Sequence, residues 1–136
     1  MRGLTAFSLI ILAACYSNPS DPITEIKGTW GGENAGLIAT DTSAHVHIGC
    51  TLGDTGTPIR PDVYGHFDVT GTYNVDAYPV DRGIIHPARF TGSVSGNELT
   101  LTVTLTDNGT VLGPVKLQQG KEPKMGPCPI CRNPRP

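Results

Sequence analysis

The chain has 136 residues and a formal net charge of −2 at pH 7, with 10 Lys and Arg against 12 Asp and Glu. This length allows one domain with one modest hydrophobic core. The balance of charge excludes the strongly basic surface that nucleic-acid binding requires, so we expect no nucleic acid among the partners.

The first segment has the layout of a secretory signal. Arg2 precedes an apolar stretch over 4–14, which is too short to span a bilayer as a finished helix. Leu12-Ala13-Ala14-Cys15 at its end resembles the lipobox of bacterial lipoproteins, in which the cysteine is acylated before cleavage. The resemblance implies a signal peptide over 1–14 and membrane anchoring through palmitate and related lipid on Cys15. The alternative is an ordinary secretory signal with an incidental cysteine.

The lipobox also predicts the domain organisation and the location. We expect a lipidated tether over 15–24, a folded domain over 25–120 and an irregular Pro-rich tail over 121–136. The protein would then lie at the bacterial cell envelope, facing the periplasm or the surface. Tyr16 stands where enteric lipoproteins carry the aspartate that retains them in the inner membrane, and this resemblance favours the outer membrane.

Alternating apolar and polar residues predict antiparallel strands through the folded domain. The alternation is clearest over 88–118, where leucines and valines alternate with threonines between short turns. One strand is expected from Gly28 to Thr40 and another over 44–50, with a loop over 51–57, further strands over 67–73 and 88–118, a short edge strand at Ile59 and an eighth strand from Ile84. The sequence shows no helical period, which favours an all-β, small antiparallel up-and-down barrel of about six to eight strands.

Gly28-Thr29-Trp30 resembles the opening of the calycins, in which the tryptophan closes one end of a barrel. Plain core packing is the other interpretation, and both predict that Trp30 is buried. Together with the strand ending in Cys50 and the segment 88–103, the opening also resembles a group of small bacterial lipoproteins without assigned function. That resemblance implies a fold and no mechanism.

Cysteines other than Cys15 number three, so we expect one disulfide and one remaining thiol in an oxidising compartment. Cys50 can pair with Cys128 or Cys131, or these two can pair with each other. A bridge that closes about 80 residues stabilises by about 4 kcal/mol in the chain-entropy model, which favours Cys50 with Cys128. Cys128 and Cys131 also have the spacing of a redox pair, although neither a strand before them nor a helix after them supports that function.

His45 and His47 share one face of a strand, roughly 7 Å apart by the rise per residue, and such a pair can hold zinc or copper. Further ligands would come from His66, His86, an aspartate or a free cysteine. The alternative is that both histidines simply face solvent, because their neighbours Val46 and Ile48 claim the core face.

Asn74 to Pro87 is the longest stretch without alternation, and we expect a lid at the barrel mouth with four apolar residues, Tyr78, Val80, Ile84 and Ile85. We find no catalytic motif and no motif that implies a cofactor, so an enzyme is not expected. The sequence predicts a membrane-anchored envelope lipoprotein that binds a small apolar ligand or an envelope partner. A periplasmic hydrolase inhibitor acting through a loop, or a metal-binding protein using the histidine pair, is the alternative.

Overall fold

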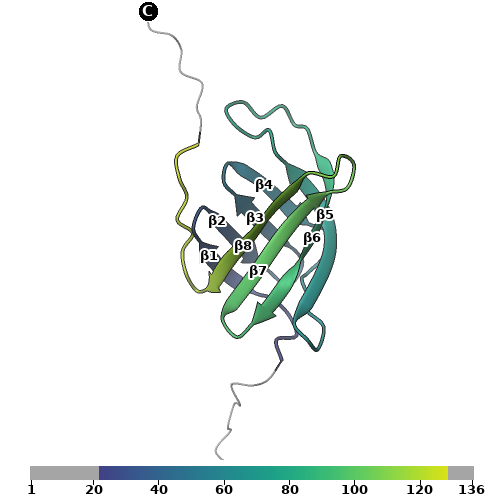
Figure 1. Ribbon diagram of the computed structural model, residues 1–136, viewed down its shortest axis with the longest axis vertical. Coiled ribbons are helices and arrows are strands. Elements are labelled where there is room, and N and C mark those ends of the chain that lie inside the picture. The colour runs from purple at the N-terminus through teal and green to yellow at the C-terminus, as the bar shows by residue number, and fades with distance from the viewer. Residues whose placement is uncertain (1–21, 129–136) are drawn as a thin grey trace, which may run out of the picture.

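A computed structural model describes residues 22–128, and these form one closed antiparallel barrel (Figure 1). The strands are β1 (Gly28–Gly32), β2 (Ala35–Ala39), β3 (Ala44–Ile48), β4 (Thr51–Thr55), β5 (His66–Asn74), β6 (His86–Ser95), β7 (Glu98–Leu105) and β8 (Val111–Gln119). Each strand pairs with the next, and β8 closes the barrel against β1. The expected all-β up-and-down barrel is confirmed.

The expected signal peptide and lipobox, with Cys15, lie outside the described residues, as does Cys131. Within 22–128, no helix is long and apolar enough to cross a membrane.

Two parts of the barrel differ from the strands that the sequence predicts, namely the β1–β2 hairpin and β4. The segment from Gly28 to Thr40 is a hairpin rather than one strand, because the chain turns at Glu33 and Asn34. Asn34 takes a φ of 53°, a left-handed conformation that asparagine tolerates better than most residues. The expected loop over 51–57 contains β4, which pairs with both of its neighbours.

The expected strands at Ile59 and Ile84 are absent from the barrel. Ile59 is fully buried outside any strand, and its carbonyl oxygen accepts a 2.9 Å hydrogen bond from the Ile26 amide. Ile84 is exposed in the loop that precedes β6. Flanking prolines keep Ile59 out of the hydrogen-bond ladder, so this residue contributes an apolar side chain to the core instead.

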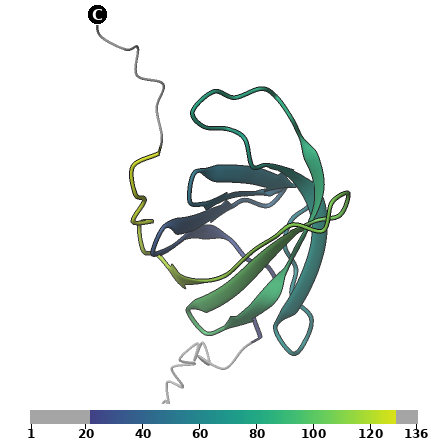
Figure 2. The same ribbon diagram turned by 45° about the horizontal axis from the view of Figure 1, so that its top comes forward.

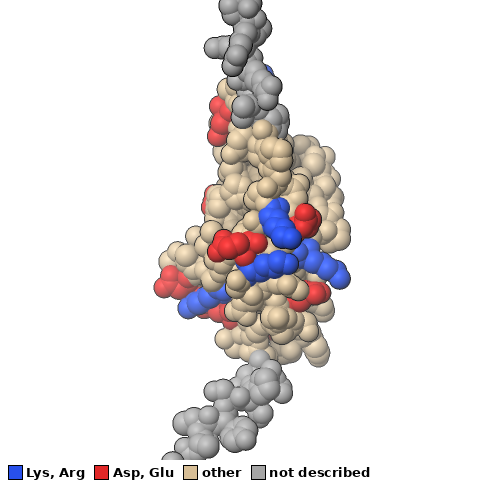
Figure 3. Space-filling model, turned by 90° about the vertical axis from the view of Figure 1, so that its left-hand side faces the viewer, with Lys and Arg blue, Asp and Glu red and all other residues tan. Residues whose placement is uncertain are grey.

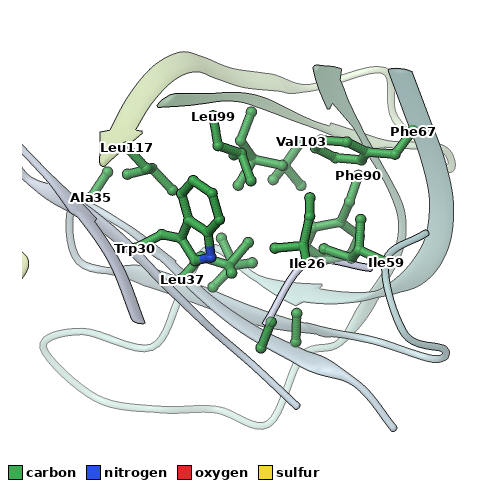
Figure 4. Packing of buried hydrophobic residues seen from close by; sticks show 14 of the residues in the cluster. Ile26, Trp30, Ala35, Leu37, Ile59, Phe67, Phe90, Leu99, Val103 and Leu117 are labelled. Carbon is green, nitrogen blue, oxygen red and sulfur yellow. The ribbon is translucent and has the colours of Figure 1, made fainter. Parts of the chain in front are cut away.

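Side chains fill the interior of the barrel (Figure 4). The largest fully buried side chains are Trp30, Tyr73 and Phe90, and the leucines of β7 pack beside them. Trp30 is 1% exposed, as expected, and its indole Nε1–H donates to the Lys27 carbonyl oxygen at 3.0 Å. Small barrels are commonly filled in this way, so a binding site has to be sought on the outside.

The residues after β8 form a strap over the outside of β1 and β2, which we call the C-terminal strap (121–128; Figures 1 and 2). The Lys124 carbonyl oxygen accepts from the Asn34 amide at 2.8 Å, and the Lys124 amide donates to the Gly32 carbonyl oxygen at 3.0 Å. Cys50 and Cys128 form a disulfide that closes 78 residues, with 5.5 Å between the Cα atoms. The described part of the expected irregular tail is therefore fixed to the barrel.

Gly31 and Gly36 make room for the strap. These two residues face each other across β1 and β2, and a Cβ on either would overlap strap atoms of Lys121, Glu122 or Pro123. Both glycines are required by the close approach of the strap rather than by their own backbone angles.

We therefore expect Gly31→Val to displace the strap and to lower the free energy of unfolding by about 1–3 kcal/mol, because the strap backbone cannot move aside at low cost. Hydrogen exchange at the Lys124 amide measures the displacement and should accelerate. Gly56→Ala is the matched control, since its Cβ would meet only the Thr70 carbonyl oxygen at 3.6 Å. Unchanged protection of Lys124 in Gly31→Val would contradict the prediction.

Candidate functional site

The connection between β5 and β6, which we call the β5–β6 loop (75–85), projects from one end of the barrel (Figures 1 and 2). The four residues expected to form a lid are exposed there: Tyr78 by 43%, Val80 by 55%, Ile84 by 43% and Ile85 by 58%. Val75, at the start of the loop, packs against the core instead. The loop therefore presents several large apolar side chains to solvent at one place.

Hydrogen bonds hold the two arms of the β5–β6 loop together. Asn74 is 3% exposed, and its Nδ2 donates to Asp81 Oδ1 at 3.0 Å. The same carboxylate oxygen accepts from the Gly83 amide at 2.7 Å, and Asn74 Oδ1 accepts from the Asp76 amide at 2.8 Å. Asn74 and Asp81 thus fix the course of the loop without help from the exposed apolar residues.

The β5–β6 loop encloses a hollow of about 400 Å³. Its walls are Asp76, Tyr78, Pro79, Val80, Arg82 and Ile84. This volume lies within the usual range of ligand pockets, roughly 300–1,000 Å³. The hollow can accept an apolar side chain or a small apolar molecule, flanked by one cationic and one anionic group.

A hydrogen bond between two side chains fastens the base of the loop to the turn between β7 and β8. His86 Nδ1 donates to Asp107 Oδ2 at 2.7 Å, and the Thr106 amide donates to the Pro87 carbonyl oxygen at 2.9 Å. The hydrogen bond from His86 lowers the pKa of Asp107 below its usual value. His86, a candidate metal ligand from the sequence, is thus engaged by a carboxylate here.

The hydrogen bond between His86 and Asp107 gives a pH-dependent prediction. A depressed carboxyl pKa in the folded state contributes stability above the unfolded pKa, and that contribution is lost as pH falls through the folded pKa. We expect His86→Ala to raise the pKa of Asp107 toward its ordinary value, measured by NMR titration of the carboxyl carbon. His66→Ala should leave the Asp107 titration unchanged, and an unshifted midpoint in His86→Ala would refute the coupling.

The other cluster of chemistry-bearing residues lies on the outer face of β3 and β4. His45 and His47 are brought together: their Nε2 atoms are 2.9 Å apart, and the rings meet edge to face with centroids 4.8 Å apart. His45 Nδ1 donates to Asp54 Oδ1 at 2.7 Å, since β3 and β4 place these two residues opposite each other. Partial burial, followed by the neighbouring His45, lowers the pKa of His47.

A cavity of about 150 Å³ lies beside the two histidines. It is lined by residues of β2 and of the C-terminal strap as well as β3, namely Gly36, Leu37, Ile38, His45, His47, Pro123 and Met125. Among residues 22–128, no group of three or more His, Cys, Asp and Glu side chains could hold a metal ion. His66 is exposed and His86 bonds Asp107, so neither joins the pair.

A further hollow, of about 520 Å³, lies at the end of the barrel where the described chain begins. It is lined by Pro22 and Ile23, where the described chain begins, and by residues 62–65. Of these, Val63 is 80% exposed and Tyr64 is 82% exposed. The β5–β6 loop projects from the opposite end (Figure 1). The two ends of the barrel thus carry separate apolar surfaces.

The face that carries the C-terminal strap has no single sign of charge, because Lys and Arg are mixed there with Asp and Glu (Figure 3).

The fold and the site together define a filled eight-stranded barrel with a disulfide-fixed strap and a projecting loop. In comparisons with protein families, curated proteins and solved structures, nothing matches this chain.

Proposed function

We propose that this protein is a non-enzymatic binding module of the bacterial cell envelope and that the β5–β6 loop contacts a partner protein. The observation that carries the proposal is the exposure of Tyr78, Val80, Ile84 and Ile85 on one projecting loop, at 43–58%. Exposed apolar side chains gathered at one place are typical of interaction sites, whereas isolated ones are ordinary.

The filled barrel supports a partner over a ligand carried inside. Trp30, Tyr73 and Phe90 occupy the interior, so the apolar surface open to a partner is outside. The bonds from Asn74 and Asp81 hold the loop before binding, which reduces the ordering cost that a flexible loop would incur. Aromatic and aliphatic anchors on a fixed loop are suited to act as interface hot spots.

The direction of the loop also fits a lipid-anchored protein. The described chain enters the barrel at the end opposite the β5–β6 loop (Figure 1). A lipid on Cys15 would precede the described chain by only a few residues, so the loop would face away from the membrane. We therefore place the binding surface toward the periplasm or the exterior.

Site-specific photo-crosslinking in the native host tests the proposal. A photoreactive residue at Ile84 should give a discrete protein adduct. The same residue at Val63, which is 80% exposed at the opposite end of the barrel, is the matched control and should give none. Absence of an adduct from Ile84, or equal adducts from both positions, would contradict a loop-directed partner.

Inhibition of a periplasmic hydrolase is a second candidate, favoured by the hydrogen bonds that fix the loop. A preorganised loop can enter an enzyme cleft with little loss of conformational entropy. If the adduct contains a hydrolase, the wild-type protein should lower the activity of that hydrolase, and the Ile84→Ser variant should lower it less.

A small apolar ligand bound in the hollow of the β5–β6 loop would instead give saturable binding of a hydrophobic fluorophore. A Val80→Asp change should remove that binding.

A further inference from the structure

We propose that His45 and His47 form a copper(II) site on the outside of the barrel, separate from the β5–β6 loop. Both imidazoles belong to β3, where the two histidines flank Val46. Val46 is fully buried in the core, so the histidines lie on the opposite, outer face of the strand. Their Nε2 atoms approach to 2.9 Å beside a small cavity. The site adds a metal-binding function to the proposed binding module and does not depend on it.

The separation of the two nitrogens fits one metal ion. Histidine nitrogens bind such metals at about 2.0–2.1 Å, so two nitrogens on one ion lie about 2.9 Å apart at an angle near 90° and about 3.3 Å apart at the tetrahedral angle. The observed 2.9 Å between His45 Nε2 and His47 Nε2 is a hydrogen-bond distance, and either angle at one ion would change this separation by less than about 0.5 Å. Adjacent ligands at right angles are typical of square-planar or tetragonal Cu²⁺.

Asp54 prepares His45 to act as a ligand. Its Oδ1 atom accepts the Nδ1–H of His45 at 2.7 Å, which leaves the Nε2 lone pair of the neutral ring directed away from Asp54. A carboxylate behind a ligating histidine fixes its tautomer and makes the ring a stronger donor. The pairing of β3 with β4 holds this arrangement, because His45 and Asp54 are register partners.

The metal-free contact is consistent with this assignment. With Nδ1 of His45 committed to Asp54, the 2.9 Å approach of the two Nε2 atoms is a hydrogen bond that shares one proton between the two imidazoles. A Cu²⁺ ion would take the place of that shared proton, which would pass to solvent. The metal therefore needs a small movement of the two rings rather than a rearrangement of β3.

The surroundings favour copper over zinc. Zinc sites in proteins use three or four protein ligands, whereas His45 and His47 supply two nitrogens. Cu²⁺ binds nitrogen ligands most tightly among the divalent metals of its row and completes its plane readily with oxygen ligands such as water. The adjoining cavity of about 150 Å³ has room for such water.

Titration of the mature, detergent-purified protein with Cu²⁺ tests the site, in a Cys131→Ser background that removes the cysteine outside the described residues. We expect binding of one equivalent by calorimetry and a tetragonal electron paramagnetic resonance spectrum with coupling to two nitrogens. His47→Gln should abolish that spectrum. Asp54→Asn, which retains both nitrogens, should weaken binding by about tenfold to a hundredfold.

His66→Gln is the matched control, because His66 is an exposed histidine on β5, and it should leave the titration unchanged. Circular dichroism of each variant establishes that the barrel is retained. Absence of binding by the folded wild-type protein, an equal loss in His66→Gln, or tighter binding of Zn²⁺ than of Cu²⁺ would overturn the proposal.

Discussion

Phe90→Ala is expected to lower the free energy of unfolding by about 3–5 kcal/mol, since it removes a large side chain from a close-packed interior. Phe90 is fully buried, and its ring lies 6.1 Å from that of Tyr73 between centroids. The ring also occupies the space that a Cβ on Gly71 would enter. The surrounding strands pair on both sides, so they cannot easily collapse into the space that the substitution leaves.

Urea denaturation measures this effect at equilibrium. Val111→Ala is the control, because Val111 is 59% exposed, and it should change stability by less than about 0.5 kcal/mol. A loss below about 1 kcal/mol for Phe90→Ala would indicate that the interior is not closely packed. An apolar ligand carried inside the barrel would then be a better account of function.

Cys50→Ser is the second substitution with a large expected effect. The disulfide closes 78 residues, and its loss should lower the free energy of unfolding by about 4 kcal/mol in the chain-entropy model. Release of Cys128 should also free the C-terminal strap from Gly31 and Gly36. Faster hydrogen exchange at the Lys124 amide would report that release, because this amide donates to the Gly32 carbonyl oxygen.

Cys131→Ser is the matched control for the disulfide prediction. It removes a cysteine but leaves the Cys50–Cys128 bridge intact, so thermal and urea stability should stay at the wild-type level. If Cys131→Ser were as destabilising as Cys50→Ser, the bridge would involve Cys131 and the described pairing would be incorrect.

The sequence predicts β5 to β7 well, because these strands alternate clearly and end at Gly, Asn and Asp turns. The alternation of β8 is interrupted, because its register against β7 shifts between Leu101 and Val103, which leaves Val111 exposed.

The sequence does not reveal β4, whose Gly53 and Asp54 are typical of turns. In the barrel, Gly53 is needed because a Cβ there would overlap the Tyr73 ring. The hairpin at Asn34 is also missed, since no glycine marks its turn.

Parts of the candidate sites depend on contacts between distant residues, which periodicity cannot show. Alternation places His45 and His47 on one face, but it assigns Asp54 to a loop and so misses the carboxylate beside His45. Met125 lies in a stretch with no pattern and reaches the histidines only because the strap crosses β2. The exposed apolar residues of the β5–β6 loop are visible in the sequence, whereas the filling of the barrel beneath them is not.

Calorimetry with the partner recovered by crosslinking tests whether the β5–β6 loop binds that partner. We expect Tyr78→Ser with Ile84→Ser to cost at least about 2 kcal/mol, roughly a thirtyfold rise in Kd. Val63→Ser with Tyr64→Ser removes comparable exposed apolar surface at the opposite end, where the residues are 80% and 82% exposed, and should leave Kd unchanged. Equal affinities for the wild-type protein and the loop variant would contradict the claim.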